Sequence, residues 1–439
     1  MLFPHQRIEN IMATITITLQ GKGRQSRFVK RLFQNDKLQL WLGFFFIVLL
    51  PILVSQGSRF WQAAGLTQWL TFLLTALAYW WSMTTVQRMS RLPGACAYLI
   101  SIPVASVCFA IPYVVVTVSE QRMLNELYFA GYFLTLLYGS VGYWIGRHHR
   151  VLKLAVVPFG KAPSLCQNQR VEWYRLDVPG LGGVDVDGVV ADLYEDLPPE
   201  WERFLADCTL NRIPVYHSTT TYEWLTGRVQ LGHLYENRYG SLRPDEGYEV
   251  FKRYLDLLIV LSTLPITLPL MVVTAIAIRM ESGSPVLFTQ QRMGFQCRPF
   301  TVYKFRSMFT DHQGSGYTED SQDPRITQVG KFIRKYRIDE LPQLYNVLKG
   351  DMSMIGPRPE SMELANWYQR DVPFFHYRHV VRPGISGWAQ VEQGYAAEVA
   401  GMNLKLEYDF YYIKNISLWL DLLIVIRTIR TVLTGFGSR

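Results

Sequence analysis

Two adjacent carboxylates, Asp339 and Glu340, stand in the stretch KYRIDELPQLYNVLKGDMSMIGPRPE, which runs from Lys335 to Glu360. The local pattern predicts a helix over ELPQLYNVLK, with Asp339 as its N-cap and Gly350 at its C-terminal end. A pair of acids among bases could also do chemistry, because carboxylates act as nucleophiles and as ligands of hard metal ions. The local sequence leaves the capping role and the chemical role both open.

Apolar residues are unevenly distributed along the chain. The chain has 439 residues, enough for two or three domains, and its hydrophobic residues, 49% of the total, gather into long runs. The net charge of +8 suits anionic lipid head groups, phosphates or nucleic acid. The aromatic-rich apolar runs favour a lipid bilayer among these partners, and we assign no nucleic acid. The five cysteines form no CxxC pair, so neither a disulfide framework nor a zinc site is indicated.

Four apolar runs follow a basic tail in the first third of the chain. Residues 1–37 are polar, end in several bases and are expected in the cytoplasm, and the four runs lie within residues 38–146. Each run approaches the ~20 residues that a helix needs to cross a bilayer. The loops after the second and fourth runs carry arginines without acids, so the positive-inside rule places both ends of this unit in the cytoplasm. We expect a four-helix transmembrane bundle formed by these runs: Leu38–Val54, Leu66–Thr85, Ala95–Val118 and Leu127–Ile145.

Residues 147–247 have the composition of a soluble domain. The segments VLKLAVVPFG, VEWYRLDV and VDGVVADL resemble short buried strands, and LPPEWERFLADCTLNRI has the pattern of a helix with proline near its start. Alternating strands and helices predict a small Rossmann-like α/β domain on the cytoplasmic side. No G-x-G-x-x-G motif follows the first strand, so we assign this domain no nucleotide.

A fifth apolar run, Leu255–Met280, contains Pro265 and Pro269. If it crossed the bilayer, the basic segment after it would leave the cytoplasm, against the positive-inside rule. Proline kinks a helix, so the run could enter one leaflet and return; an ordinary kinked span is the alternative. Hydroxyl side chains expected to bond the freed carbonyls lie nearby: Ser262, Thr263 and Thr267.

Two further features are assigned structural roles. The stretch NISLWLDLLIVIRTIRTVLTG is interrupted by charged residues, which favours an amphipathic helix in the membrane interface over a span. Arg253 and Asp256 are three residues apart, which predicts an ion pair on one helix face.

Several motifs occur together after the proline-containing run. They are FKRYLDLL (251–258), GSPVLFTQQRMG (283–294), FTVYKFRSM (300–308), the stretch around the acid pair, RPGISGWAQV (382–391) and YDFYYIKN (408–415). In this order they resemble the bacterial sugar transferases, that is, the polyprenyl-phosphate hexose-1-phosphate transferases or large monotopic phosphoglycosyl transferases. The resemblance spans residues 251–439, and the preceding units match the large members more loosely. The segment EQGYAAEVAGMNLKLEYDFYYIKN departs from the NGRN-type sequence of other members, which leaves the sugar open.

The resemblance implies a fold class, membrane α plus α/β. It adds to the predicted units an α-rich monotopic catalytic domain in residues 248–439. That domain would contain a re-entrant membrane helix over 255–280, broken near Pro269, and the C-terminal interfacial helix. The large members also suggest a homodimer in the bacterial inner membrane, with the catalytic domain on the cytoplasmic face.

The resemblance also implies an activity. A sugar 1-phosphate would pass from a UDP-sugar to undecaprenyl phosphate, releasing UMP and starting exopolysaccharide, capsule or O-antigen assembly. Asp339 matches the nucleophile, which would form a covalent phosphosugar intermediate, and Glu340 matches a Mg²⁺ ligand. Asp339 and Asp409 are further candidate metal ligands, and contact with the nucleotide is the alternative for Asp409. The candidate phosphate-binding residues are Arg292, Lys304, Arg306, Arg358 and Arg382. A surface turn is the alternative for Arg358, and contact with lipid head groups is the alternative for the other four.

Two other functions compete with this one. A phosphatidyltransferase that uses CDP-alcohols needs a D-G-x-x-A-R cluster in a membrane helix, and the sequence has none. A non-catalytic membrane scaffold of glycan assembly is the alternative, but a scaffold has no use for an acid pair among arginines.

Overall fold

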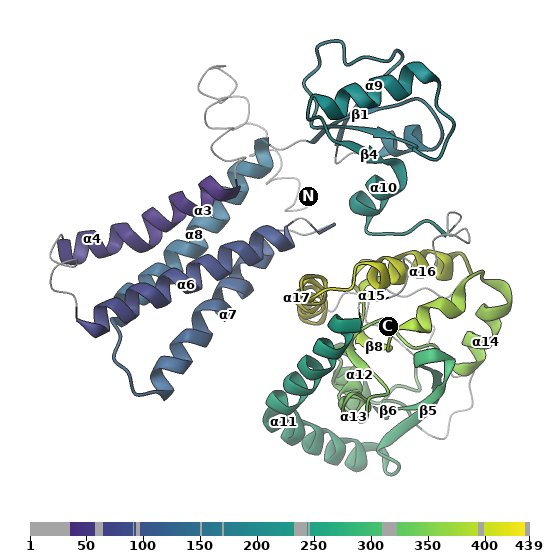
Figure 1. Cartoon of the computed structure of the whole chain (residues 1–439). Coiled ribbons are helices and arrows are strands. Elements are labelled where there is room, and N and C mark those ends of the chain that lie inside the picture. The colour runs from purple at the N-terminus through teal and green to yellow at the C-terminus, as the bar shows by residue number, and fades with distance from the viewer. Residues whose placement is uncertain are drawn as a thin grey trace, which may run out of the picture. The chain divides into compact units, whose positions relative to one another are not determined.

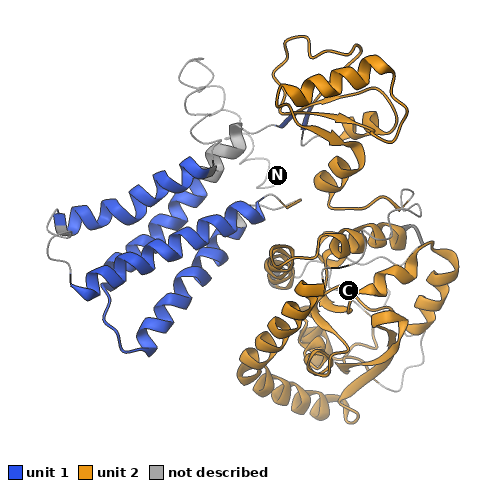
Figure 2. Cartoon of the chain, viewed as in Figure 1, with its two compact units in different colours: residues 1–91, 95–153, 170–172 blue, residues 92–94, 154–169, 173–439 orange. Residues whose placement is uncertain are grey.

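The computed structural model describes residues 36–57, 65–90, 92–93, 97–149, 152–168, 171–231, 244, 246–309, 323–393 and 399–434. Most of the predicted basic tail, 1–37, therefore lies outside the described residues. The chain divides into two compact units (Figure 2). The first comprises residues 1–91, 95–153 and 170–172, and the second comprises residues 92–94, 154–169 and 173–439.

The first unit is built from helices that coincide with the four predicted apolar runs (Figure 1). They are α3 (Asp36–Phe44), continued by η1 (Phe45–Leu49) and α4 (Leu50–Gln56), then α6 (Leu66–Met89), α7 (Ala97–Val118) and α8 (Asn125–His149). Tyrosine hydroxyls join them: Tyr79 on α6 donates to Leu40 O at 2.9 Å, and Tyr128 on α8 donates to Phe109 O at 2.7 Å. Tyr79 and Tyr128 also belong to the apolar core of this unit.

Three helices in the described part of the chain are long and apolar enough to cross a membrane: Lys37–Ser55, Ile100–Val118 and Glu246–Ser282. Helices α6 and α8 have 24 and 25 residues, which is the length of a span, but they are not among these three. Helix α6 buries several polar side chains within the unit: Thr71, Thr75, Ser82 and Thr85.

Most of the predicted α/β domain belongs to the second unit. Its strands β1 (Leu152–Val156), β2 (Val171–Arg175), β3 (Gly188–Ala191) and β4 (Val215–His217) form one sheet in the order β2-β1-β3-β4. Strand β3 pairs in parallel with β1 and with β4. Helix α9 (Pro199–Leu210) begins with the expected proline and buries Trp201 and Leu205 in the same apolar cluster as Val189 of β3. The α/β prediction is confirmed.

A short helix, α10 (Ser218–Thr226), leads from β4 to the C-terminal part of the same unit. Its terminal turn passes through Gly227 in a left-handed conformation (φ +67°), and Trp388 Nε1 donates to Gly227 O at 2.9 Å. Lys414 Nζ lies 2.8 Å from Glu223, and Val229 N donates to the backbone oxygen of Glu407 at 3.0 Å. The segment 218–229 is therefore in contact with the C-terminal domain.

The C-terminal part is rich in helices and contains two small two-stranded sheets. Strands β5 (Leu287–Met293) and β6 (Pro299–Phe305) are antiparallel, and β7 (Ser353–Ile355) and β8 (Gly384–Ser386) are parallel. The remaining elements are α11 (Glu246–Ser282), η6 (Phe295–Cys297), α12 (Gln328–Lys335), η7 (Ile338–Glu340), α13 (Gln343–Lys349), α14 (Met362–Asp371), η8 (Phe375–Val380), α15 (Trp388–Glu392), α16 (Val399–Lys414) and α17 (Leu418–Thr434).

Helix α11 bends, and both of its halves return to the same domain (Figure 1). Val260 belongs to an apolar cluster with Val302 of β6, and Ile278 belongs to a cluster with Phe305 of the same strand. Eighteen residues of straight helix would span ~27 Å, whereas three residues of a strand span ~10 Å. The helix must therefore bend between the two contacts, in the interval that contains both prolines.

The part of α11 around the bend presents apolar side chains to its surroundings. The exposed residues there are Leu261, Ile266, Leu268, Leu270, Val272, Val273 and Ile276. The hydroxyls do not bond the carbonyls freed by the prolines, those of Leu261 and Pro265, and this part of the prediction is wrong. Ser262 and Thr263 donate to Ile259 O instead, and Thr267 donates to Thr263 O.

Helix α17 forms where the amphipathic helix was expected. Its residues Leu420, Leu423 and Ile424 are at most 1% exposed, so this apolar face is buried in the protein and is not available to a bilayer. Asp421 explains the interruption of the apolar run, because it accepts hydrogen bonds from Lys252 Nζ at 2.6 Å and from Tyr412 at 2.8 Å.

Candidate active site

The acid pair lies in a 3-10 turn and does not begin the following helix. Ile338–Glu340 form this turn, and α13 begins at Gln343 with Pro342 as its N-cap residue. The prediction that Asp339 caps the helix is therefore wrong, whereas Gly350 ends it as expected, with φ +96°. Arg337, just before the pair, adopts a left-handed conformation (φ +56°), which is uncommon for a residue other than glycine and often occurs at functional sites. Because α13 begins at Gln343, the Asp339 side chain does not cap it.

Glu340 is buried and surrounded by three cations. Its Oε1 lies 2.7 Å from Arg358 Nη2, 3.5 Å from Lys304 Nζ and 3.7 Å from Arg337 Nη1. Burial alone would raise the pKa of Glu340, but the charges of Arg358 and Lys304 outweigh it and hold the pKa far below its usual range. Glu340 is therefore a fixed negative charge.

Asp339 has a different environment from its neighbour. It is partly buried, and burial together with the charge of Glu340 raises the pKa of Asp339 to about 6, against the opposing effect of Lys304. Its Oδ1 atom is buried and has no hydrogen-bond partner among the residues that the structure describes. One acid of the pair is thus held by cations, and the other retains an unused oxygen.

Lys304 and Arg358 are positioned by different elements. Lys304 lies on β6, where burial is the main cause that lowers the pKa of its amine to about 8. Arg358 stands between two prolines, and the carbonyls of this stiff segment are held from both sides. Arg292 Nη1 donates to Pro359 O at 2.6 Å, and Arg378 Nη2 donates to Arg358 O at 2.8 Å.

A buried charge network supports the Arg358 segment from behind. Arg378 Nη2 lies 2.8 Å from Asp409 Oδ2, and its Nη1 lies 3.5 Å from Glu360, which also contacts Lys405. Arg378 and Asp409 are 2% and 1% exposed. Burial raises the pKa of Asp409, while Arg378 and Lys405 oppose this rise. The structure therefore gives Asp409 a cationic partner in this network.

The structure brings Asp339, Glu340, Lys304 and Arg358 together, with Arg292 beside them, but it gives Arg306 different neighbours. Arg306 Nη2 donates to Ser282 O at 2.7 Å and Gly283 O at 2.9 Å, so it binds the C-terminal end of α11. Its Nε and Nη1 atoms are buried, and no described residue accepts a hydrogen bond from them.

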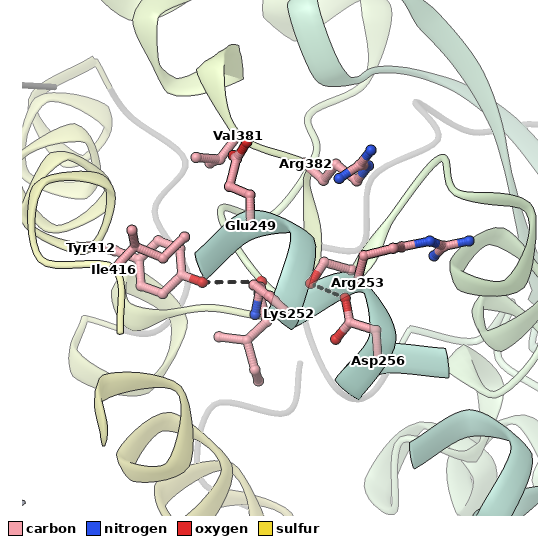
Figure 3. Close-up of a pocket in the computed structure, with 10 residues that line it drawn as sticks. Glu249, Lys252, Arg253, Asp256, Val381, Arg382, Tyr412 and Ile416 are labelled. Carbon is pink, nitrogen blue, oxygen red and sulfur yellow. Dashed lines mark hydrogen bonds between the residues drawn. The ribbon is translucent and has the colours of Figure 1, made fainter. Parts of the chain in front are cut away.

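Arg382 lies on the wall of a separate polar pocket beside the N-terminal half of α11 (Figure 3). Its guanidinium also lies 5.4 Å from the centre of the Phe295 ring. The same pocket contains Arg253 and Asp256, which do not form the predicted ion pair. Asp256 instead accepts from Ser353 Oγ at 2.7 Å, and Arg253 donates to Leu348 O at 2.9 Å.

Three arginines that were not predicted as site residues lie in or behind the site. Arg337 contacts Glu340, the charge of Arg334 acts on Asp339, and Arg378 holds the Arg358 segment. Arg334 and Arg337 precede the acid pair by only a few residues, so a tight turn could have been expected to bring them back to it. No local signal marked Arg378, because its partners are distant in sequence.

The acid pair can be compared with the requirements of a magnesium ion. Within the described ranges, no group of three or more metal-ligating side chains gathers in one place. Mg²⁺ commonly takes only one or two carboxylates when substrate phosphates and water complete its shell. Asp339 Oδ1 is an unused oxygen of this kind, and Glu340 is adjacent. The site therefore fits a Mg²⁺ ion that arrives with a phosphorylated substrate.

Comparison with known proteins identifies the class. Residues 247–435 match the family described as bacterial sugar transferase. The chain is 46% identical over 419 residues, 95% of its length, to UDP-N-acetylgalactosamine-undecaprenyl-phosphate N-acetylgalactosaminephosphotransferase of Aeromonas hydrophila, and covers 99% of that protein. It is also 39% identical over 200 residues to UDP-glucose:undecaprenyl-phosphate glucose-1-phosphate transferase of Xanthomonas campestris pv. campestris, which is 45% of this chain and 41% of that protein. The chain belongs to the bacterial sugar transferase family and is an enzyme of the phosphoglycosyl transferase class.

Proposed function

We propose that this enzyme transfers a sugar 1-phosphate from a UDP-sugar to undecaprenyl phosphate and releases UMP. The observation that carries the proposal is the acid pair itself, in which Glu340 is fixed by Arg358 and Lys304 while Asp339 keeps an oxygen without a partner. The names of the relatives supply the substrate classes. The product would begin a lipid-linked glycan such as an exopolysaccharide, capsule or O-antigen.

In the first step, a carboxylate oxygen of Asp339 attacks the β-phosphorus of the UDP-sugar. A phosphorus–oxygen bond to Asp339 forms, the bond to the oxygen that bridges to the α-phosphate breaks, and UMP leaves with that electron pair. With a pKa of about 6, Asp339 is ionised at neutral pH and needs no separate base. The charges of Lys304, Arg358 and Arg292 offset the phosphate charge.

In the second step, a phosphate oxygen of undecaprenyl phosphate attacks the same phosphorus. The bond to Asp339 breaks, the carboxylate is restored, and undecaprenyl diphosphate sugar is formed without net proton transfer. We assign Arg306 to the acceptor phosphate, because it lies at the end of membrane helix α11 and two of its donor nitrogens have no acceptor in the described structure. Arg382 is assigned to the same charge compensation from its neighbouring pocket.

Asp339 and Glu340 would hold Mg²⁺ together with the diphosphate of the donor. Such an ion, when bound, neutralises the charge of the leaving UMP. The contacts of Asp409 support a different role for it, as the residue that keeps Arg378 behind the Arg358 segment.

We further propose that α11 is a re-entrant helix broken near Pro269, with the domain of residues 248–439 on the cytoplasmic face of the inner membrane. The return of both helix halves to one domain and the exposed apolar bend support this topology. The four helices within residues 38–146 would anchor the chain as a transmembrane bundle, residues 147–247 would be cytoplasmic, and the enzyme would act as a homodimer.

The reaction is tested by incubating the purified chain with undecaprenyl phosphate, Mg²⁺ and a panel of UDP-sugars. The 46% identity to the Aeromonas hydrophila enzyme makes UDP-N-acetylgalactosamine the first donor of the panel. We expect repeated turnover, measured as UMP release, only when both the UDP-sugar and undecaprenyl phosphate are present. A scaffold protein would release no UMP with any donor, and this result would contradict the proposal.

A further inference from the structure

The segment 218–229 leads from the α/β domain to the C-terminal domain and is bound firmly to the latter. It lies outside residues 247–435, so the family match assigns it no role. Glu223 of this segment is 6% exposed, and Lys414 Nζ of α16 lies 2.9 Å and 2.8 Å from its two carboxylate oxygens. A buried carboxylate is costly unless it is paired, so this contact fixes the segment on α16.

The end of the same segment holds the indole of Trp388, the first residue of α15. Trp388 is 1% exposed, and its Nε1 donates to Gly227 O at 2.9 Å. The guanidinium of Arg427 lies 4.8 Å from the centre of the same ring. A buried indole N–H is costly to leave without an acceptor, and the upstream segment supplies this acceptor. The segment therefore helps to set the position of the ring.

The backbone beside Trp388 touches the backbone that carries Arg358. Ser386, two residues before Trp388, accepts a hydrogen bond at its backbone oxygen from Gly356 N at 2.8 Å. A Cβ atom on Gly387 would clash with Gly356 O, so the two backbones meet here without a side chain between them. Close-packed protein interiors have low compressibility and transmit strain. A displacement of Trp388 is therefore passed to Gly356, two residues before Arg358.

We propose that Trp388 is a positioning residue, held by Gly227 O, which keeps β8 and through it the Arg358 segment in place. The segment 218–229 thereby contributes to the reaction, although it precedes the catalytic domain in the sequence. Arg358 needs accurate placement because its guanidinium must make two hydrogen bonds to Glu340 at once. The inference rests on the proposed function, because it takes UMP release as the reaction that Arg358 supports.

The test is a double-mutant cycle in the full chain that combines Trp388→Phe with Arg358→Lys and measures kcat/KM for UMP release. Trp388→Phe keeps an aromatic ring but removes the N–H that bonds to Gly227 O. We expect kcat/KM to fall about tenfold, because a small displacement of a group in the site is enough for such a loss. In the Arg358→Lys background the same substitution should lower kcat/KM less than about twofold, because the paired hydrogen bonds to Glu340 are already lost.

Gly227→Ala reaches the same contact from the other side and leaves Trp388 itself unchanged. A Cβ atom on Gly227 would lie 3.0 Å from Trp388 Cζ2, so the ring must move. The matched control is Gly182→Ala, which has similar left-handed strain (φ +56°) but no described atom within 4 Å of the added Cβ. A control for the indole is Trp173→Phe, since Trp173 Nε1 donates to Asn168 O at 2.8 Å within the α/β domain. Gly227→Ala should lower kcat/KM several-fold, and both controls should leave it unchanged.

The cycle separates positioning from a general loss of stability, which would lower kcat/KM by the same factor in both backgrounds. If Trp388→Phe does not fold, Gly227→Ala takes its place in the cycle with Arg358→Lys. Equal factors in the two backgrounds, or unchanged kcat/KM in the folded variants beside an active wild type, overturn this inference alone. A wild type that releases no UMP overturns the proposed function and this inference with it.

Discussion

The guanidinium of Arg358 donates two hydrogen bonds to the carboxylate of Glu340: Nη2 lies 2.7 Å from Oε1, and Nη1 lies 3.4 Å from Oε2. Arginine forms such two-pronged contacts with carboxylates, and lysine cannot reproduce them. The contact fixes the second acid of the pair as an anion and leaves the first acid available. Two neighbouring carboxylates thereby acquire different roles from their surroundings, not from their chemical type.

Replacing Arg358 should separate the effect of its charge from the effect of its geometry. We expect Arg358→Ala to reduce kcat/KM for UMP formation at least 100-fold, because it leaves buried Glu340 with one arginine fewer. Arg358→Lys keeps the charge but cannot form the two parallel hydrogen bonds, so its kcat/KM should fall about tenfold. The control is Arg370→Ala, which replaces an exposed arginine on α14 and should leave kcat/KM unchanged. Equal activity of wild type and Arg358→Lys would contradict the two-pronged role.

The activity should have a bell-shaped dependence on pH. Asp339 must lose its proton to attack, so kcat/KM should rise as the pH increases through its pKa of about 6. Lys304 loses its positive charge as the pH increases through about 8, so the activity should fall again. In Lys304→Arg the alkaline limb should disappear because arginine stays protonated. An alkaline limb that persists in this variant would assign it to another group.

Variants of Glu340 and of Asp409, two of the three candidate metal-binding acids, should respond differently to magnesium. In Asp409→Asn, Arg378 loses the charge of its 2.8 Å partner and the Arg358 segment is held less firmly, so kcat should fall while the Mg²⁺ concentration for half-maximal activity stays unchanged. In Glu340→Gln that concentration should rise several-fold, because a charged oxygen ligand is lost. A raised Mg²⁺ requirement in Asp409→Asn would show that Asp409 is a ligand.

The re-entrant topology can be tested by labelling in intact cells. Single cysteines at Gly247, in the first turn of α11, and at exposed Asp371, on α14, are introduced after the five native cysteines are replaced. Both positions should be protected from a membrane-impermeant thiol reagent and should react after the cells are opened. Labelling at position 371 alone in intact cells would mean that α11 crosses the membrane.

Sequence predicted the elements better than it predicted the contacts between them. Apolar runs and strand patterns identified the helices of the first unit and the parallel sheet, because they depend on local periodicity and length. The prediction that Asp339 is the N-cap is wrong because the left-handed residue Arg337 and the following 3-10 turn place the start of the helix at Gln343. Asp409 was placed with the metal by motif alone, and its partner Arg378 lies 31 residues earlier in the sequence, a contact that only the tertiary fold creates.

The central claim is that Asp339 becomes covalently linked to the phosphosugar. The most direct measurement is mass spectrometry of peptides from the full chain after incubation with a UDP-sugar and Mg²⁺, without undecaprenyl phosphate. The account predicts a mass increase of one phosphosugar on Asp339, which disappears when undecaprenyl phosphate is added and is absent from folded Asp339→Asn. An adduct on another residue, or an Asp339→Asn variant that still releases UMP at the wild-type rate, would contradict it.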